Sequence, residues 1–197
     1  MNNFYIKDIK MVFKIRNLDY KFVKIDSIGD GSCMFHSILQ CFNKTYIDSS
    51  DDGKRKIVQQ FRKDLSNILD EKVGSELCYD QLSRGQLKVI AQSVPEVSLK
   101  NMKRSLASNE WGDVRFLELI SNVLNINIFV IFSETGDIYH SGDSDIYIKN
   151  RDSIIIYNSS NVHFDSVGLV SKSRLRTLFS YEEDVIKKLR SKLYKGN

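Results

Sequence analysis

The sequence predicts an α+β fold, with helices packed on a small central β-sheet, because two hydrophobic patterns follow one another along the chain. Apolar residues first recur at helical spacing, most clearly over about residues 52–72. Continuous β-branched and aromatic runs come later, at 126–132 and 153–157, and indicate buried strands. Hydrophobic residues make up 42% and charged residues 27% of the chain, which is ordinary for a globular domain.

Helical spacing also marks the segment after Gly31. Residues 33–42 place four large apolar side chains on one face of a helix. The longer helix over 52–72 would be capped by Ser50 or Asp51. Its expected core-facing residues are Ile57, Phe61, Leu65, Ile68 and Leu69. Shorter helices are expected near residues 80–93 and 98–106, and after Asp113.

Further strands and a last helix complete the prediction. The first 25 residues alternate loosely and predict one or two strands, and residues 162–167 predict another after turn residues 158–161. An amphipathic C-terminal helix is expected to bury Val185, Ile186, Leu189 and Leu193. No repeat or linker divides the chain, so we expect a single domain over 1–180 and this helix over 181–197.

The charge distribution and the absence of targeting signals in the sequence argue against several classes of protein. The net charge of +4 is spread along the chain, so the basic C-terminal residues predict a solvated helix face rather than a nucleic-acid site. No apolar run is long enough to span a membrane, and charges interrupt the N-terminal apolar residues as they do not in a signal peptide. We therefore expect a cytoplasmic monomer that binds neither nucleic acid nor membrane.

The three cysteines cannot all pair within one molecule, which predicts free thiols in a reducing compartment. Cys41 and Cys78 fit buried packing, the usual role of an isolated cysteine. Cys33 and His36 have the spacing of a metal-binding pair, but no second close Cys/His pair follows. The sequence therefore predicts neither a metal site nor a cofactor.

Cys33 lies in the segment IGDGSCMFHS, residues 28–37, and has two explanations. It is either a packed core residue or a nucleophile. A nucleophilic cysteine reacts as a thiolate, and free N–H groups at a helix start lower the pKa of a thiol there. Gly29 and Gly31 would let the backbone turn tightly and direct N–H groups at an oxyanion. These glycines and Asp30 favour the nucleophile, because a packing cysteine needs none of them.

A nucleophilic cysteine needs a base, and the chain has three histidines. His36 lies one helical turn from Cys33, which leaves little room for a substrate, so we expect a structural role. His140 is expected in an exposed loop. His163 lies on a late strand, which gives base and thiol separate platforms. Asp165 points to the same face of that strand and can orient the imidazole.

Three segments resemble the ovarian-tumour (OTU) family of cysteine deubiquitinases. They are DGSCMFHS around Cys33, EWGDVRFLELISNVLNINIFVI at 110–131, and VHFDSV around His163. Their order and spacing agree with the family, and the resemblance covers about residues 22–170. The first segment is specific, the second is supportive, and the third is short.

The resemblance implies a papain-like fold of OTU type and hydrolysis of the isopeptide bond after the C-terminal glycine of ubiquitin. By position, it makes Cys33 the nucleophile, His163 the general base and Asp165 the orienting acid. Asp30 matches the family's aspartate in the loop that forms the oxyanion hole. Ubiquitin and polyubiquitin chains are the expected partners, and a ubiquitin-like modifier is a second candidate.

Substrate contacts are predicted around the same loop. Gly31 and Ser32 adjoin the nucleophile, and Trp111 matches a tryptophan close to the active-site groove in relatives, although a core or loop-anchoring role stays equally open. Glu110 and Asp113 are candidate partners of the basic ubiquitin tail, but acids beside a helix start are more often caps.

Two alternatives to the enzyme remain. One is a catalytically inactive ubiquitin-binding module, which the intact triad residues disfavour, and the other is a nucleic-acid-binding protein that uses the basic C-terminal helix. The compact arrangement is similar to viral members of the family. A viral source would place the protein in the host cytoplasm, with a role in host immune evasion.

Overall fold

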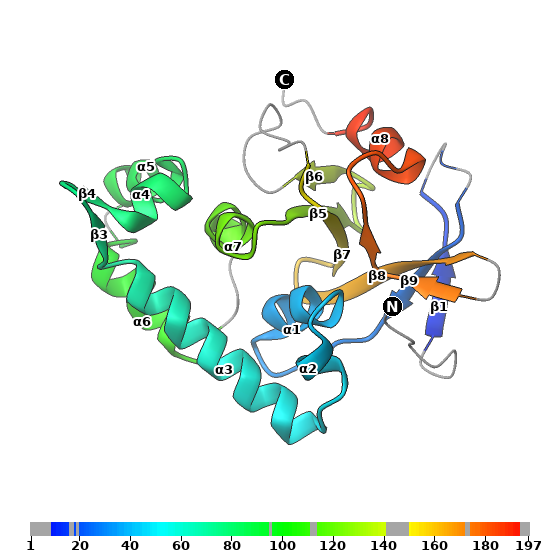
Figure 1. Ribbon diagram of the computed structural model, residues 1–197, viewed down its shortest axis with the longest axis horizontal. Helices are drawn as coiled ribbons and strands as arrows, with labels where there is room; N and C mark the ends of the chain where they lie inside the picture. The colour runs from blue at the N-terminus through cyan, green and yellow to red at the C-terminus, as the bar shows by residue number, and fades with distance from the viewer. Residues whose placement is uncertain are drawn as a thin grey trace.

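A computed structural model gives the structure of the chain (Figure 1). It describes residues 9–15, 18, 20–94, 96–110, 114–140, 150–171 and 174–193. The helices are α1 (Cys33–Gln40), α2 (Lys44–Ile47), α3 (Asp51–Ile68), α4 (Cys78–Leu82), α5 (Gln86–Ser93), α6 (Leu99–Ala107), a 3-10 turn (Val114–Phe116), α7 (Leu117–Leu124) and α8 (Asp184–Arg190). The strands are β1 (Ile9–Phe13), β2 (Phe22–Ile25), β3 (Lys72–Val73), β4 (Glu76–Leu77), β5 (Asn127–Phe132), β6 (Ile138–His140), β7 (Ser153–Ser159), β8 (His163–Ser171), β9 (Arg174–Arg176) and β10 (Leu178–Phe179).

One mixed sheet organises the described part of the chain. Its main order is β1-β2-β8-β7-β5-β6, while β9 pairs with β8 and β10 with β7. β5 and β7 run parallel, and every other pair in this sheet is antiparallel. The expected strands near the N-terminus and at β5, β7 and β8 are confirmed, and the α+β class with them. The short strands β6, β9 and β10 are not predicted by the sequence.

The centre of the sheet is buried on both faces. Along β5, Ile128 and Val130 belong to a core shared with α1, α3 and α7, whereas Phe129 and Ile131 belong to a second core with α8. This alternation follows from the two-residue period of a strand. It explains why this segment is continuously apolar rather than alternating. Figure 1 shows α3 to α6 extending away from the sheet on the side opposite α8.

The C-terminal helix packs onto the domain. α8 buries Val185, Ile186 and Leu189 in the second core, and Leu193 packs against the same core. The amphipathic pattern therefore predicts the correct apolar face, but the expected length is wrong, because the helix ends at Arg190. No helix in the described part of the chain combines the length and apolar character needed to cross a membrane.

Helix α3 differs from its prediction in what it buries. Its start is as expected, because the Ser50 hydroxyl accepts a hydrogen bond from the Gly53 N–H. Leu65 is buried, but Ile57 and Phe61 are only partly covered. Arg62 is almost fully buried instead, between α1 and the end of α6. The buried face is thus rotated toward a charged residue that apolar spacing does not identify.

Candidate active site

Cys33 is the first residue of α1, as the sequence predicts. Gly31 has a φ of +79°, a left-handed conformation that suits glycine, and it turns the chain into the helix. Ser32 is buried at the N-cap position, where its side chain makes no capping hydrogen bond. The Ser32 side chain therefore occupies none of the amide groups in the first turn of α1.

The Cys33 thiol is buried, and burial raises its pKa above the ordinary value. Backbone hydrogen bonds involving Phe164, Met34 and Cys33 itself lower the pKa, and the charge of Asp165 raises it further. The lowering of the thiol pKa by backbone groups at the helix start, which the sequence predicts, is thus present, but burial outweighs it. In this structure the neutral thiol is favoured, so a base must take its proton for the sulfur to attack.

His163 is the first residue of β8 and stands beside the nucleophile loop. A side-chain carbon added at Gly29 would lie 3.8 Å from the His163 ring. The contact between Cys33 and the Phe164 backbone brings the sulfur next to His163 along the strand. The Ser166 hydroxyl donates to the Ser37 carbonyl at 2.9 Å, which ties β8 to α1. The candidate base and the candidate nucleophile therefore come from two elements held against each other.

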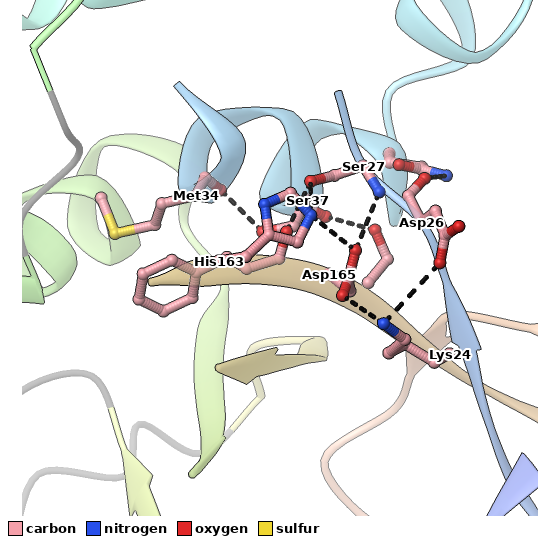
Figure 2. A network of polar contacts seen from close by, with 10 residues as sticks. Lys24, Asp26, Ser27, Met34, Ser37, His163 and Asp165 are labelled. Carbon is pink, nitrogen blue, oxygen red and sulfur yellow. Dashed lines mark hydrogen bonds and ion pairs between the residues drawn. The ribbon is translucent and has the colours of Figure 1, made fainter. Parts of the chain in front are cut away.

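Asp165 holds one nitrogen of the His163 ring. The His163 Nε2 and the Asp165 Oδ1 are 3.0 Å apart, and the carboxylate is fully buried (Figure 2). The carboxylate can only accept, so Nε2 carries the proton in this hydrogen bond, and in a neutral ring Nδ1 is then the nitrogen with the lone pair. The predicted placement of both side chains on one face of the strand is confirmed.

Two residues that the sequence does not single out, Lys24 and Ser27, complete the surroundings of Asp165. The Ser27 N–H donates to Oδ1 at 3.0 Å, and the Lys24 ammonium donates to Oδ2 at 2.8 Å. The Ser27 hydroxyl donates to the Phe164 carbonyl and lies 3.5 Å from His163 Nε2. Both carboxylate oxygens thus have partners, as a buried charge requires.

Asp30 belongs to a separate network. Its Oδ1 accepts from the Ser32 N–H at 3.1 Å, and its Oδ2 lies 3.2 Å from His36 Nε2 and 3.5 Å from Arg55 Nε. The other ring nitrogen, Nδ1, lies 2.7 Å from the Tyr46 hydroxyl. Burial lowers the pKa of His36, which favours a neutral ring that donates to Asp30 and accepts from Tyr46. This fits the expected structural role of His36 and ties the nucleophile loop to α2.

Arg62 connects this loop to a distant segment. Its guanidinium donates to the Ser32 hydroxyl at 2.7 Å, and to the carbonyls of Leu106 at 3.0 Å, Ser105 at 2.7 Å and Glu110 at 2.8 Å. The side chain of Glu110 is exposed, so its predicted contact with substrate stays a prediction. Arg62 therefore links the residue before the nucleophile to the chain that leads toward position 111.

The sequence also assigns roles to Trp111, Asp113, Cys41 and His140. Trp111 and Asp113 fall outside the described residues. Cys41 is buried, and burial raises the pKa of its thiol to about 12, which fits the expected packing role. His140 ends strand β6, so the expected loop is wrong. Among the described residues, no group of three or more His, Cys, Asp or Glu side chains could hold a metal ion.

A family match accounts for this geometry. The family model of OTU-like cysteine proteases matches residues 28–164, which is more than half of the chain. The chain belongs to the OTU-like cysteine protease family. The matched range contains Cys33 and His163 and ends one residue before Asp165.

Solved OTU structures share the fold. An ovarian tumor (OTU) domain in complex with ubiquitin superposes with a TM-score of 0.58 at 16% identity, over 88% of this chain and 83% of that chain. The Hazara virus OTU bound to ubiquitin gives 0.51 at 17% identity, over 87% of this chain and 96% of that chain. The predicted OTU-type fold is thus confirmed. No curated protein matches the sequence.

Two of the three site residues that the sequence does not single out, Lys24 and Arg62, carry a weak sequence signal. Lys24 interrupts the otherwise apolar run FVKI of β2, and a charge inside a buried strand is unusual. Arg62 comes four residues after Val58 and three residues before Leu65, so it occupies a position at helical spacing from apolar residues. Ser27 has no such signal, because its contacts arise only when the loop after β2 crosses the start of β8.

Proposed function

We propose that this OTU-family protein is a deubiquitinase that hydrolyses the isopeptide bond after the C-terminal glycine of ubiquitin. The observation that carries the proposal is the His163–Asp165 hydrogen bond at 3.0 Å beside the helix start that holds Cys33. Family membership supplies the protease chemistry. Two similar OTU domains are seen with ubiquitin, which supports ubiquitin as the substrate.

The proposed reaction starts with a proton transfer. His163 Nδ1 takes the proton of the Cys33 thiol, and the sulfur attacks the carbonyl carbon of the terminal glycine. Asp165 accepts from Nε2–H and stabilises the imidazolium that forms. The oxyanion of the tetrahedral intermediate is stabilised by N–H groups at the start of α1, where Asp30 fixes the Ser32 amide.

The second half of the reaction returns the proton. The imidazolium donates it to the leaving lysine amine, which leaves ubiquitin as a thioester on Cys33. His163 then takes a proton from water, and the resulting attack on the thioester releases the ubiquitin carboxylate. The thiol is regenerated when the imidazolium returns its proton to the sulfur.

A ubiquitin probe with a C-terminal vinyl electrophile tests this proposal. The wild-type protein should form a covalent adduct, and Cys33→Ala should form none while it still binds ubiquitin. Cys78→Ala is the matched control and should form the adduct normally, because Cys78 is partly exposed and lies outside the site. Ubiquitin binding without any adduct in the wild type would support the inactive binding module instead.

The finer assignments extend this proposal. Cleavage of polyubiquitin chains, and of a ubiquitin-like modifier, is tested by digesting the eight diubiquitin types and the corresponding modifier substrate. A viral source, with action in the host cytoplasm against immune signalling, is a further proposal that rests on the compact arrangement of the sequence, which resembles viral members of the family. We also propose that the protein is a cytoplasmic monomer. Cell fractionation measures its location, and gel filtration measures its oligomeric state.

A further inference from the structure

Lys24 lies next to the proposed catalytic residues although it belongs to the first part of the chain. On β2 it pairs with Val167 of β8, and the two-residue period puts its side chain on the same face as Asp165. The ammonium reaches Asp165 Oδ2 at 2.8 Å, as Figure 2 shows. Its side chain keeps only 20% of its exposure, so this ion pair is largely withdrawn from water.

Lys24 and His163 contact different oxygens of the Asp165 carboxylate. Oδ1 accepts from the Ser27 N–H and lies 3.0 Å from the His163 ring, whereas Oδ2 accepts from Lys24. The carboxylate is therefore held from both ends. Rotation of the Asp165 side chain would break the contacts with Lys24 and with the ring together.

Other charges around Lys24 keep it protonated. Burial lowers its pKa, but the hydrogen bond and charge of Asp165, with Asp26 at 3.8 Å and Tyr157 on β7, raise it above the ordinary value. Across the site, the charge of Asp165 raises the pKa of the Cys33 thiol. A fixed positive charge beside Asp165 opposes that effect.

We infer that Lys24 is a positioning residue of the active site, which fixes the Asp165 carboxylate and balances its charge when the Cys33 thiolate and the His163 imidazolium form. This inference rests on the proposed function. With Lys24 present, thiolate, imidazolium, carboxylate and ammonium sum to zero. Without it, the site carries a net negative charge in a largely buried place, which is unfavourable.

The charge balance fixes the direction of a pH shift. Removing a positive charge makes loss of a proton harder at both the thiol and the imidazolium, so both limbs of the pH–rate profile should move to higher pH. We expect a shift of about 0.5–1 pH unit, because Lys24 is close but partly solvated. On the acid limb this is a decrease in rate of about 3–10-fold at fixed pH.

The experiment compares three variants at pH 5–10. Lys24→Met removes the charge and keeps most of the side chain, Lys24→Arg keeps the charge, and Lys21→Met removes a matched charge from an exposed neighbour. The readouts are the rate of Cys33 alkylation by iodoacetamide, followed on its peptide, and kcat/KM with a fluorogenic ubiquitin substrate. Lys24→Met should shift both pH profiles to higher pH, whereas Lys24→Arg and Lys21→Met should leave them unchanged.

An unmoved profile in Lys24→Met, even with a lower melting temperature, would show that Lys24 only ties β2 to β8 and would overturn the inference. An equal shift in Lys21→Met would do the same. If Lys24→Met does not fold, Lys24→Gln takes its place with the same expectation. Alkylation needs no ubiquitin, so failure of the wild type to turn over the ubiquitin substrate would count against the proposed function alone.

Discussion

Replacing the buried Arg62 by Met should destabilise the protein far more than the same replacement of a surface arginine. The guanidinium is nearly inaccessible to water and lies 4.6 Å from the centre of the Phe35 ring. Its four hydrogen bonds reach the Ser32 hydroxyl and three backbone carbonyls near the end of α6. Those carbonyls include Ser105 and Leu106 in the last turn of the helix, where the helix dipole is negative.

The size of the effect follows from what Met leaves behind. Met fills part of the space but donates no hydrogen bond, so buried acceptors lose their partner. Each unsatisfied buried group costs about 1–3 kcal/mol, and the terms are not additive. Because several buried acceptors lose a charged donor together, we expect a loss of about 3–5 kcal/mol for Arg62→Met, at the upper end for a single substitution. Because domains of this size are stable by about 5–15 kcal/mol, the variant should still fold at low temperature.

Urea unfolding followed by circular dichroism measures the loss, and Arg55→Met is the matched control. Arg55 lies on the same helix, is about half exposed, and pairs with Asp30 and Asp52 at 3.5 and 3.4 Å. Exposed pairs of this kind contribute at most about 1 kcal/mol. If Arg62→Met loses no more stability than Arg55→Met, the buried guanidinium does not hold α3 to the end of α6, and the reasoning fails.

Three further predictions concern the site itself. His163→Asn should abolish turnover with little loss of stability. His36→Asn should mainly lower stability, by about 1–3 kcal/mol, since it leaves buried partners unsatisfied. A stable but inactive His36→Asn variant beside an active His163→Asn variant would contradict this prediction. Asp30→Ala should lower kcat about 10²–10³-fold and leave Cys33 alkylation near wild type, whereas Asp165→Ala should slow both, and the reverse pattern would exchange the two roles. Burial lowers the pKa of His36 below its ordinary value of 6.5, so the contribution of the neutral ring to the free energy of unfolding should be complete above pH 6.5 and be lost as the pH drops below it. In urea titrations, a variant without this histidine should lose stability less steeply as the pH falls, and an equal slope would refute the assignment.

The sequence predicts those site residues that local rules control. Glycines on both sides of an acid predict a tight turn ahead of Cys33, and a residue two places after His163 must share its face of a strand. The same local rules predict the strands β5 and β7, because a sheet covered on both faces needs continuous apolar runs. These features depend on neighbours within a few residues.

The sequence does not predict contacts that join distant segments. Lys24 and Asp165 are 141 residues apart, and their contact depends on the pairing of β2 with β8. Arg62 is buried because α6 ends beside it, which apolar spacing on α3 cannot reveal. The raised pKa of the Cys33 thiol has the same origin, since burial by other elements outweighs the local amide groups.

The two aspartates of the site belong to networks that share no hydrogen-bond partner among the described contacts. Asp30 contacts Ser32 and His36 in and after the loop before the proposed nucleophile, and Asp165 contacts the proposed base, His163. One network is fixed to α1 and α2, and the other to β2 and β8. A substitution in one should therefore leave the other in place, so that oxyanion stabilisation and activation of the base can be measured separately in this protein.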